Sequence, residues 1–336
     1  MRRSFHDAFR HTRTLLAVTS STLCWSGKVT FAESHAREEV SEISLTDLSP
    51  ITPIRIFRPN PNLEIAFDVR TRNPVYVLER LVFDNYGGNN DSKPQRRRRP
   101  RFREEASLPE AYRSRNSCYH LSGYDRGHLA PAADFHDPKQ FDDTFTLCNV
   151  SPQHHVMNRM IWANLEQWTR HLARRAWEQD RATTTYVLSG PLWLPASQVG
   201  DKSFQYVFSA IGRPPSLVSV PTHFFKVVAV TKGQQITEFA CFCVPNDESS
   251  AANNKTLQDW VVRWTDLEAV TGLQFFPSIV CDDWKTTADA LTIQVHSATM
   301  LLTAGSSQPS SKPKKALLQH PSLHLCRNGQ CQPRVR

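Results

Sequence analysis

The chain has 336 residues, of which 40% are apolar, so it can bury a substantial core in one large domain or two ordinary ones. Its 40 Lys and Arg against 32 Asp and Glu give a formal charge of +8, which fits a polyanionic partner, either nucleic acid or an anionic membrane surface. No run of about 18 apolar residues occurs, so we expect no membrane-spanning helix.

The first thirty residues differ in composition from the rest of the chain. They are rich in Ser and Thr, and their charged residues are four arginines and one acid: Arg2, Arg3, Arg10, Arg13 and Asp7. An amphipathic, Arg-rich and acid-poor leader is typical of a mitochondrial transit peptide, which we place at residues 1–30. The mildly apolar run LLAVTSSTLC leaves a secretory signal open as the alternative. The acidic, hydroxyl-rich residues 31–50 are expected to be a linker.

Periodicity and turn signals predict the next elements. Residues 63–83 contain two β-rich runs separated by TRNP, and because Asn-Pro marks a turn they predict a hairpin. Apolar residues spaced three and four apart predict an amphipathic helix over 161–180. Further β-rich runs follow at 183–194 and 221–245, and the second is broken by KGQQ, a hairpin signal.

The last predicted element lies within residues 265–277, where we expect a short helix that ends at Gly272 and leads into an extended piece. The order of elements is therefore strands, helix, strands. This order favours an α+β fold with an antiparallel sheet and not a succession of βαβ units.

The cysteines show no zinc-ribbon spacing. The eight are Cys24, Cys118, Cys148, Cys241, Cys243, Cys281, Cys326 and Cys331. Cys241 and Cys243 lie two apart in a strand-like run, so we expect them to pack on one face. Most are expected to be reduced structural thiols, while a disulfide between the last two remains open. Three histidines recur every eight residues (His120, His128 and His136), but without cysteines at ligand spacing they do not predict zinc.

Two polar segments contain few apolar residues. The loop 87–103 includes four consecutive arginines, and it is either a solvated or targeting segment or a contact to a phosphate backbone. Residues 307–336 begin as a Ser-, Pro- and Lys-rich stretch, and we expect this tail to be disordered.

The segment SGYDRGHLAPAADF carries His128 directly after a glycine. A packed core histidine and a general base are both open from this motif alone. Some thirty residues further on, Asn158, Trp162 and Glu166 are spaced so that they share one side of a helix that begins near Asn158. An amide oxygen and a carboxylate two turns apart suit a hard cation such as Mg²⁺, whose other ligands are usually water and phosphate.

These residues supply the parts that phosphodiester hydrolysis requires, namely a base, a cation and positive groups for the phosphates. Arg126 lies two residues before His128, on the same side of a strand, where it can contact phosphate. The alternatives are a structural His128, a helix-capping Asn158 and a local hydrogen-bond or ion-pair role for Asp125. The residues alone thus fit a basic α+β protein, with a metal-dependent phosphodiesterase as one reading.

The motif DRGHLAPAADF, followed by DDTFTLCNVSPQ and NRMIWANLE, resembles the DNA/RNA non-specific endonucleases of the ββα-metal, or His-Me finger, class. Within that family the match is closest to the mitochondrial endonuclease G subfamily. Further similar segments, such as YVLSGPLWLP and VSVPTHFFKVVAV, occur in the same order, and the resemblance covers roughly residues 50–306. It implies an α+β fold in which a central antiparallel sheet is flanked by helices, with the endonuclease domain at residues 51–306.

The resemblance implies a role for each residue of the site. His128 is the general base, and Asn158 is the direct protein ligand of a Mg²⁺ whose other ligands are mostly waters, with Mn²⁺ able to substitute. Glu166 orients those waters, Asn149 shapes the site, and Arg126 and Arg159 contact the substrate phosphates. We also expect Gly127 to leave room for phosphate beside His128.

The resemblance further implies DNA and RNA substrates, a homodimer and import into mitochondria. Residues 281–300 look like an insertion, and the loop 93–103 is longer than in many relatives. Two alternatives stay open from the sequence: a catalytically silent nucleic-acid-binding protein of the same fold, and a secreted scavenging nuclease.

Overall fold

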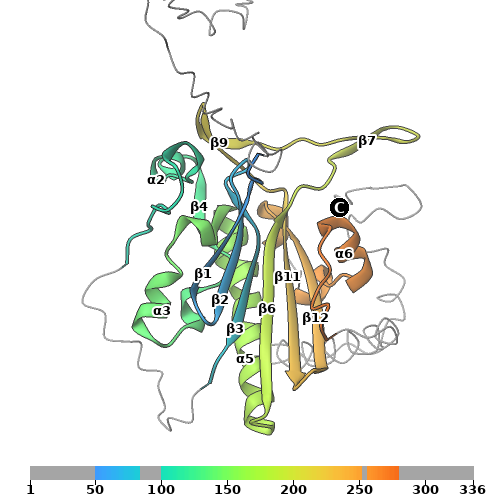
Figure 1. Ribbon diagram of the computed structural model, residues 1–336. Helices are drawn as coiled ribbons and strands as arrows, with labels where there is room; N and C mark the ends of the chain where they lie inside the picture. Colours follow the sequence, from blue (N-terminus) through green and yellow to red (C-terminus); the bar gives the residue numbers. More distant parts are fainter. Residues whose placement is uncertain (1–49, 84–99, 252–255, 280–336) are drawn as a thin grey trace, which may run out of the picture. The chain divides into compact units, whose positions relative to one another are not determined.

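The computed structural model describes residues 50–83, 100–251 and 256–279 (Figure 1). Several sequence predictions concern segments outside the described residues: the leader 1–30, nearly all of the linker 31–50, the four consecutive arginines, the segment 281–300, the boundary at 306 and the tail with Cys326 and Cys331.

A six-stranded sheet organises the described residues, and each neighbouring pair in it is antiparallel. In spatial order its strands are β1 (Ile54–Asn60), β2 (Leu63–Asp68), β3 (Asn73–Leu81), β6 (Thr183–Leu192), β11 (His223–Lys232) and β12 (Gln235–Pro245). The two predicted hairpins are confirmed as β2–β3 and β11–β12. The second turns at Gly233, whose φ of 61° favours glycine. The sequence did not predict β1, an edge strand without a regularly alternating buried face.

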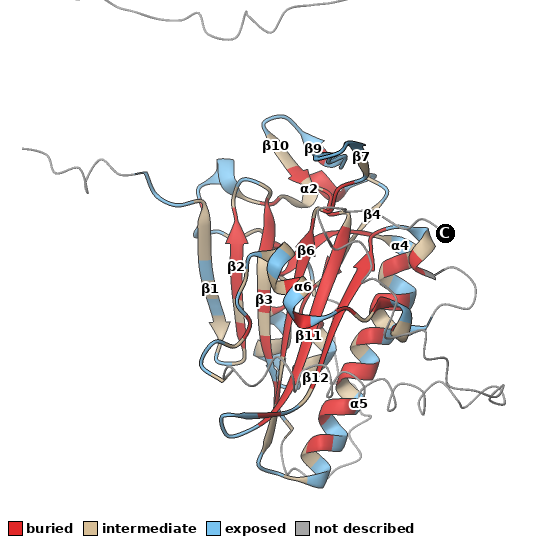
Figure 2. Cartoon of the chain, turned by 90° about the vertical axis from the view of Figure 1, so that its right-hand side faces the viewer, coloured by how far each residue is buried: buried red, intermediate tan, exposed pale blue. Residues whose placement is uncertain are grey.

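Successive side chains of β11 point to opposite faces of the sheet and so divide the core into two layers. One set packs with helix α5 (Ala163–Gln179) and the other with helix α6 (Trp264–Thr271): Phe224, Val228 and Val230 toward α5, and Phe225, Val227 and Ala229 toward α6. Figure 2 shows both helices beside the buried central strands. The expected sheet flanked by helices is therefore confirmed.

The two predicted helices are also present. α5 accounts for most of the helix expected over 161–180, and it buries Leu165, Trp168 and Leu172 against the sheet. α6 ends at Gly272, whose φ of 68° allows the left-handed C-terminal cap.

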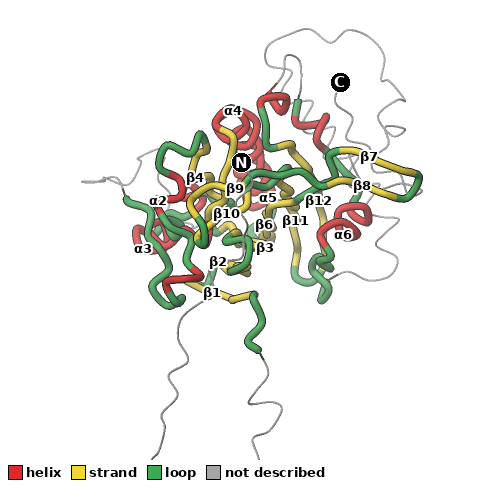
Figure 3. The backbone as a smooth tube through the Cα atoms, turned by 90° about the horizontal axis from the view of Figure 1, so that it is seen from above, coloured by secondary structure: helices red, strands yellow, loops and turns green. Residues whose placement is uncertain are grey.

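The other elements are short. Three small hairpins pair β4 (Tyr124–His128) with β5 (Val150–His154), β7 (Ser197–Gly200) with β8 (Ser203–Gln205), and β9 (Ala210–Arg213) with β10 (Ser216–Ser219). The helices are α2 (Asn116–Tyr119), α3 (Pro138–Asp143), α4 (His155–Met157) and a π-helical turn (Asn158–Trp162), with 3-10 turns at Glu110–Tyr112, Ala132–Asp134, Leu147–Asn149, Glu248–Ala251 and Leu257–Trp260. The β7–β8 arm projects away from the sheet, as Figure 3 shows from above.

The described cysteines are free thiols, and all four are buried: Cys118, Cys148, Cys241 and Cys243. Cys241 and Cys243 pack on the face toward α6, as their spacing predicted, and burial raises the pKa of Cys243 to about 12. No helix in the described ranges is long and apolar enough to span a membrane.

Candidate active site

The β4–β5 hairpin places His128 at the end of β4, opposite Val150. The backbone amide of Leu129, the next residue, donates to the carbonyl of Asn149 at 3.0 Å. From β5 the chain passes through α4 and the π-helical turn into α5, so the hairpin and this helix bring the two halves of the sequence motif together.

His128 lies among aromatic rings. Its imidazole centroid is 5.0 Å from the ring of Phe102 and 4.9 Å from that of Phe145, the latter edge to face. Its Nε2 is buried and has no hydrogen-bond partner in the described part of the chain. Burial lowers the pKa of His128 to about 4, so its imidazole is neutral near pH 7. A neutral imidazole has the lone pair that a general base requires.

Asn149 is fully buried and fixes the backbone that follows His128. Its Oδ1 accepts from the amide of Ala130 at 3.0 Å, and its Nδ2 donates to the carbonyls of Ala130 at 2.9 Å and Thr144 at 3.0 Å. These three bonds engage both ends of the side-chain amide. Asn149 therefore fixes the backbone at Ala130 and Thr144.

Asn158 and Arg159 both bind Asp125. The Nδ2 of Asn158 donates to Oδ2 of Asp125 at 3.0 Å, while Arg159 donates to both carboxylate oxygens at 3.0 and 2.9 Å. Burial alone would raise the pKa of Asp125, but the hydrogen bonds from Arg159 and Asn158 outweigh it and lower that pKa. The expected local role of Asp125 as acceptor and ion-pair partner agrees with these contacts, and in addition they orient Asn158.

The helix that carries Asn158 begins with α4 at His155 and continues as a π-helical turn from Asn158, whereas the i, i+4, i+8 spacing assumes a regular α-helix. Trp162, at the end of this turn, is fully buried, and its indole Nε1 donates to the carbonyl of His128 at 3.2 Å. Single π turns inside helices are frequent at functional sites. Trp162 thus joins the helix to the hairpin at the proposed base.

Arg126 shares an aromatic neighbour with His128. Its guanidinium carbon lies 6.0 Å from the centroid of Phe102 and 5.3 Å from that of Tyr119, and its Nη2 donates to the carbonyl of Asn116 at 2.8 Å. The common contact with Phe102 agrees with the expected placement on the His128 side of β4. Cation–π contacts and the carbonyl hold the guanidinium in a fixed position.

The packing of Gly127 differs from our expectation. A side-chain Cβ at this position would overlap the Gln153 side chain on the neighbouring strand. Gln153 is fully buried, so it has little freedom to move away. Close packing between β4 and β5 is thus by itself a reason for glycine at this position, independent of any room for a phosphate.

A buried group of charged side chains extends beneath Glu166. It joins three carboxylates and two cations from β3, the 3-10 turn after β4, α5 and β11: Glu79, Asp134, Glu166, Arg170 and Lys226. Arg170 pairs with Asp134 at 2.7 Å. Burial raises the pKa of Glu166 to about 7 although Lys226 lowers it, and burial also raises the pKa of Glu79 and of Asp134.

The sequence predicted no role for the other four members of this group. A signal for two of them exists, because Glu79 in YVLERL and Lys226 in HFFKVV are charged residues within strand-like runs. A charge at a position whose strand neighbours i±2 are buried must find partners in the core. Arg170, one helical turn after Glu166, follows the spacing of side-chain pairs on a helix.

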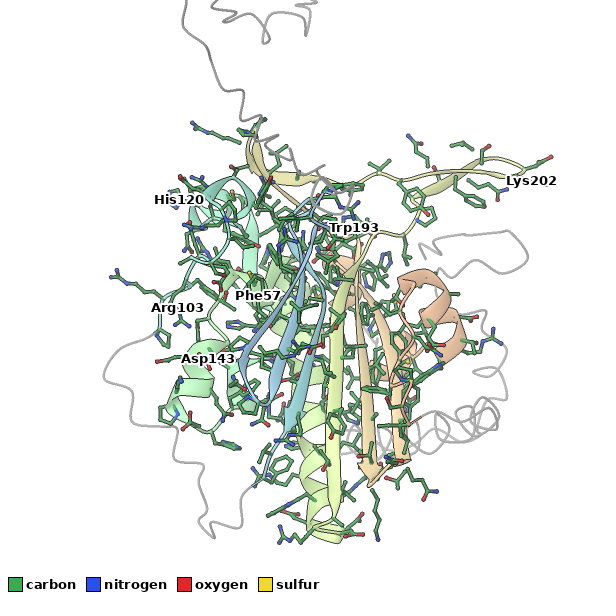
Figure 4. All side chains as sticks on the ribbon, in the orientation of Figure 1. Phe57, Arg103, His120, Asp143, Trp193 and Lys202 are labelled. Atoms are coloured by element: carbon green, nitrogen blue, oxygen red, sulfur yellow. The ribbon has the colours of Figure 1, made fainter. Side chains whose placement is uncertain are left out.

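The described part of the chain also contains a cavity of about 290 Å³. Its lining comes from β1 and from the segments around residues 105 and 145: Phe57, Pro59, Arg103, Glu104, Glu105, Ala106, Asp143, Thr146 and Cys148. Phe57, Arg103 and Asp143 are labelled in Figure 4. Three carboxylates line the cavity, while Arg103 donates to the Asp142 carbonyl at 2.7 Å. This balance of charge is unsuited to a phosphate backbone.

The donor set around Asn158 fits a single divalent cation. Asp125 holds Nδ2, and no hydrogen-bond donor in the described part of the chain engages Oδ1, which leaves the hard oxygen that Mg²⁺ prefers. No cluster of three or more His, Cys, Asp or Glu placed to hold a metal occurs among the described residues. One amide ligand with a nearby carboxylate matches an ion that keeps several waters.

The packing of Gly127 leads to a stability prediction. Gly127→Ala should lower the free energy of unfolding by about 1–3 kcal/mol, because the new methyl group overpacks against Gln153. In a Gln153→Ala background the same substitution should cost much less, since the side chain it meets is gone. Urea denaturation of the four proteins measures this coupling. An equal cost of Gly127→Ala in both backgrounds would contradict the proposed steric cause.

Comparison with known proteins agrees with this geometry. The sequence pattern of the DNA/RNA non-specific endonuclease family matches residues 51–280. The mitochondrial endonuclease G of Homo sapiens is 36% identical over 217 residues, which are 64% of this chain and 68% of that protein. The mitochondrial nuclease of Saccharomyces cerevisiae is 33% identical over 234 residues, which are 68% and 67% of the two chains.

A solved structure of the EndoG/EndoGI complex contains a chain that superimposes with a TM-score of 0.55 and 29% identity, covering 69% of this chain and 88% of that one. The likeness is consistent with the ββα-metal fold expected from the motif. Family membership implies nucleic-acid substrates and a divalent metal cofactor. The chain therefore belongs to the DNA/RNA non-specific endonuclease family and is a phosphodiester hydrolase.

Proposed function

We propose that this endonuclease cleaves DNA and RNA with His128 as general base and with Mg²⁺ bound through Asn158. The observation that carries the proposal is the pair of bonds joining the two motif halves. Asp125 holds the amide nitrogen of Asn158 at 3.0 Å, and Trp162, four residues later, donates to the His128 carbonyl at 3.2 Å. Base and metal ligand are thus set by one connected frame.

His128 takes the proton of the attacking water. Its aromatic surroundings keep the imidazole neutral, so the form that accepts a proton is present throughout the physiological pH range. No nucleophilic side chain is needed in this scheme, because water attacks phosphorus directly.

Asn158 holds the cation through Oδ1, and Glu166 acts on it through water. A divalent cation supplies positive charge that stabilises the phosphate oxygens as negative charge develops on them. Glu166 is partly buried, one turn into α5, so its carboxylate adds negative charge beside the cation with little screening by solvent. Mn²⁺ has similar ligand preferences and is expected to substitute.

Arg126 and Arg159 are the proposed phosphate contacts. The role of Arg126 is supported by its cation–π contacts with Tyr119 and Phe102, which hold its guanidinium in place. The Arg159 side chain is ion-paired with Asp125 and yet 68% exposed, so its outer surface is accessible to a substrate. Two positive groups flanking the base orient a phosphodiester for attack.

Mitochondrial import and a homodimer complete the proposal. Relatives of 33–36% identity are mitochondrial nucleases, and the Arg-rich leader supports the same address. The projecting β7–β8 arm and the segment after it expose Val199, Tyr206, Val207 and Phe208, which supports association of two copies. Cell fractionation with N-terminal sequencing distinguishes import from secretion, since a secreted form would lose its leader to signal peptidase.

The central test is His128→Ala with His120→Ala, an exposed histidine eight residues earlier, as the matched control. His128→Ala should reduce plasmid cleavage by at least about 100-fold because the base is lost, while the control stays near wild type. Circular dichroism checks that both proteins fold, and EDTA should abolish wild-type cleavage. Near-normal cleavage by a folded His128→Ala protein would refute the assignment. Asn158→Ala should also be damaging, with partial recovery at high Mg²⁺.

A second prediction separates the two partners of Asp125. Asp125→Ala should raise the Mg²⁺ concentration needed for half-maximal activity about 10–100-fold, because the Asn158 amide loses the bond that orients it. Arg159→Ala keeps that bond and should mainly raise KM for substrate. Initial rates on an oligonucleotide, titrated with Mg²⁺ and with substrate, measure both effects. An equal rise in metal requirement in both variants would mean that the ion pair orients Asn158.

A third prediction concerns pH. Because the pKa of Glu166 is raised to about 7 and that of His128 is lowered to about 4, Glu166 protonates first as the pH falls. A protonated Glu166 carries no negative charge to attract the cation and its waters, so the half-maximal Mg²⁺ concentration should rise by up to about tenfold per unit below pH 7. Glu166→Gln should remove most of this dependence. Rates at pH 5.5–8 over a Mg²⁺ series test it, and an unchanged slope in the variant would exclude Glu166 as its source.

A further inference from the structure

Lys226 is a buried cation in the middle of the sheet. Its exposed fraction is 1%, and it lies on β11 between Phe224 and Val228, on the face that packs with α5. A lysine is almost never buried without partners, because removing its charge from water is costly. Its contacts therefore indicate what the charge does.

The ammonium group of Lys226 contacts three separate parts of the protein. It donates to Oγ of Ser189, its cross-strand neighbour on β6, at 2.7 Å. It donates to the carbonyl of Leu129, the residue after His128, at 3.3 Å. It also lies 4.7 Å from the ring centroid of Trp162, within the range of a cation–π contact.

Two of these contacts converge on the proposed base. The carbonyl of Leu129 accepts a hydrogen bond from the Lys226 ammonium, and the carbonyl of His128 accepts one from the indole N–H of Trp162. The same ammonium also contacts the ring of Trp162. The carbonyls of His128 and Leu129 are thus hydrogen-bonded to a helix residue and to a sheet residue, respectively. Through its contacts with Leu129 and Trp162, Lys226 connects both the backbone after His128 and the helix to the sheet.

The charge of Lys226 also matches its surroundings. Glu79 on β3 and Glu166 on α5 interact electrostatically with it, and both carboxyl groups are more costly to ionise without a nearby cation. An apolar side chain of the same length would fill the space without these bonds. The hydrogen bonds and charge interactions at position 226 therefore require a cationic side chain there, and not only one of the right size.

We propose that Lys226 is a positioning residue, which fixes the His128–Leu129 backbone and Trp162 and thereby sets the base relative to Asn158. The inference rests on the proposed roles of His128 and Asn158. Lys226 acts through these residues and touches neither substrate nor metal in this scheme. Its loss should therefore reduce the rate of the chemical step and leave substrate binding nearly intact.

The test compares Lys226→Met with Lys232→Met in the full-length protein. Lys232 is at the end of the same strand, with a side chain that is 59% exposed and paired with Asp180, so it is the matched control. Lys226→Met should lower kcat about 10–100-fold at saturating substrate and Mg²⁺, with KM changed less than about threefold, because a small displacement of the base is costly. Lys232→Met should keep wild-type kcat.

Chemical rescue separates positioning from simple loss of packing. In Lys226→Ala, added ethylammonium should occupy the vacated space and raise kcat at least about threefold, while wild type and Lys232→Ala should not respond. Wild-type kcat in a folded Lys226→Met protein, or no rescue by the amine, would overturn the inference. If the Lys226 variants do not fold, Ser189→Ala decides, because it removes only the 2.7 Å partner: a lowered kcat at constant KM supports positioning, and an unchanged kcat overturns it.

Failure of the proposed function gives a different pattern. If the His128→Ala protein is active, His128 is not the general base, and the proposed function fails whatever the Lys226 variants do. An inactive His128→Ala protein together with a fully active Lys226→Met protein would reject the positioning role alone. The two hypotheses are thus distinguished by one set of variants.

Discussion

The candidate site depends on the hydrogen bonds that Asp125 accepts from Asn158 and Arg159. Because Nδ2 of Asn158 donates to the Asp125 carboxylate on β4, the amide oxygen of Asn158 is left to face another group. The guanidinium of Arg159 balances the carboxylate charge and keeps its pKa low, so the acceptor stays ionised. Asp125 therefore fixes the orientation of the Asn158 amide.

The sheet behind the site imposes a second constraint, because it buries Glu79 and Lys226 within a group of five charged side chains. The three carboxylates respond to the same cause, since burial raises each pKa and the cations reduce that rise. For Glu166 the effect of burial exceeds that of Lys226 and Arg170, and its pKa reaches about 7. The Glu166 carboxyl group is therefore only partly ionised at neutral pH.

Local patterns in the sequence were sufficient for most of the scaffold. The hairpins at 63–83 and 221–245 and the helix ending at Gly272 follow from alternation and turn residues, which are local properties. The π-helical turn at Asn158–Trp162 does not follow from the i, i+4, i+8 spacing, which assumes a regular α-helix. The close packing of Gly127 against Gln153 could not be foreseen either, because Gln153 lies 26 residues away on another strand. The partners of Glu79 and Lys226 are equally distant in sequence.

Burial acts on the two titrating groups of the site with opposite signs. It lowers the pKa of His128 to about 4 and raises that of Glu166 to about 7, so each group is driven toward its uncharged form. In the free protein the base is therefore neutral and the carboxyl group only partly ionised at neutral pH. A divalent cation and a phosphodiester would bring their own charges into these partly desolvated surroundings. Charge interactions in such surroundings are stronger than in water, and a prearranged site gains this strength without reorganising during the reaction.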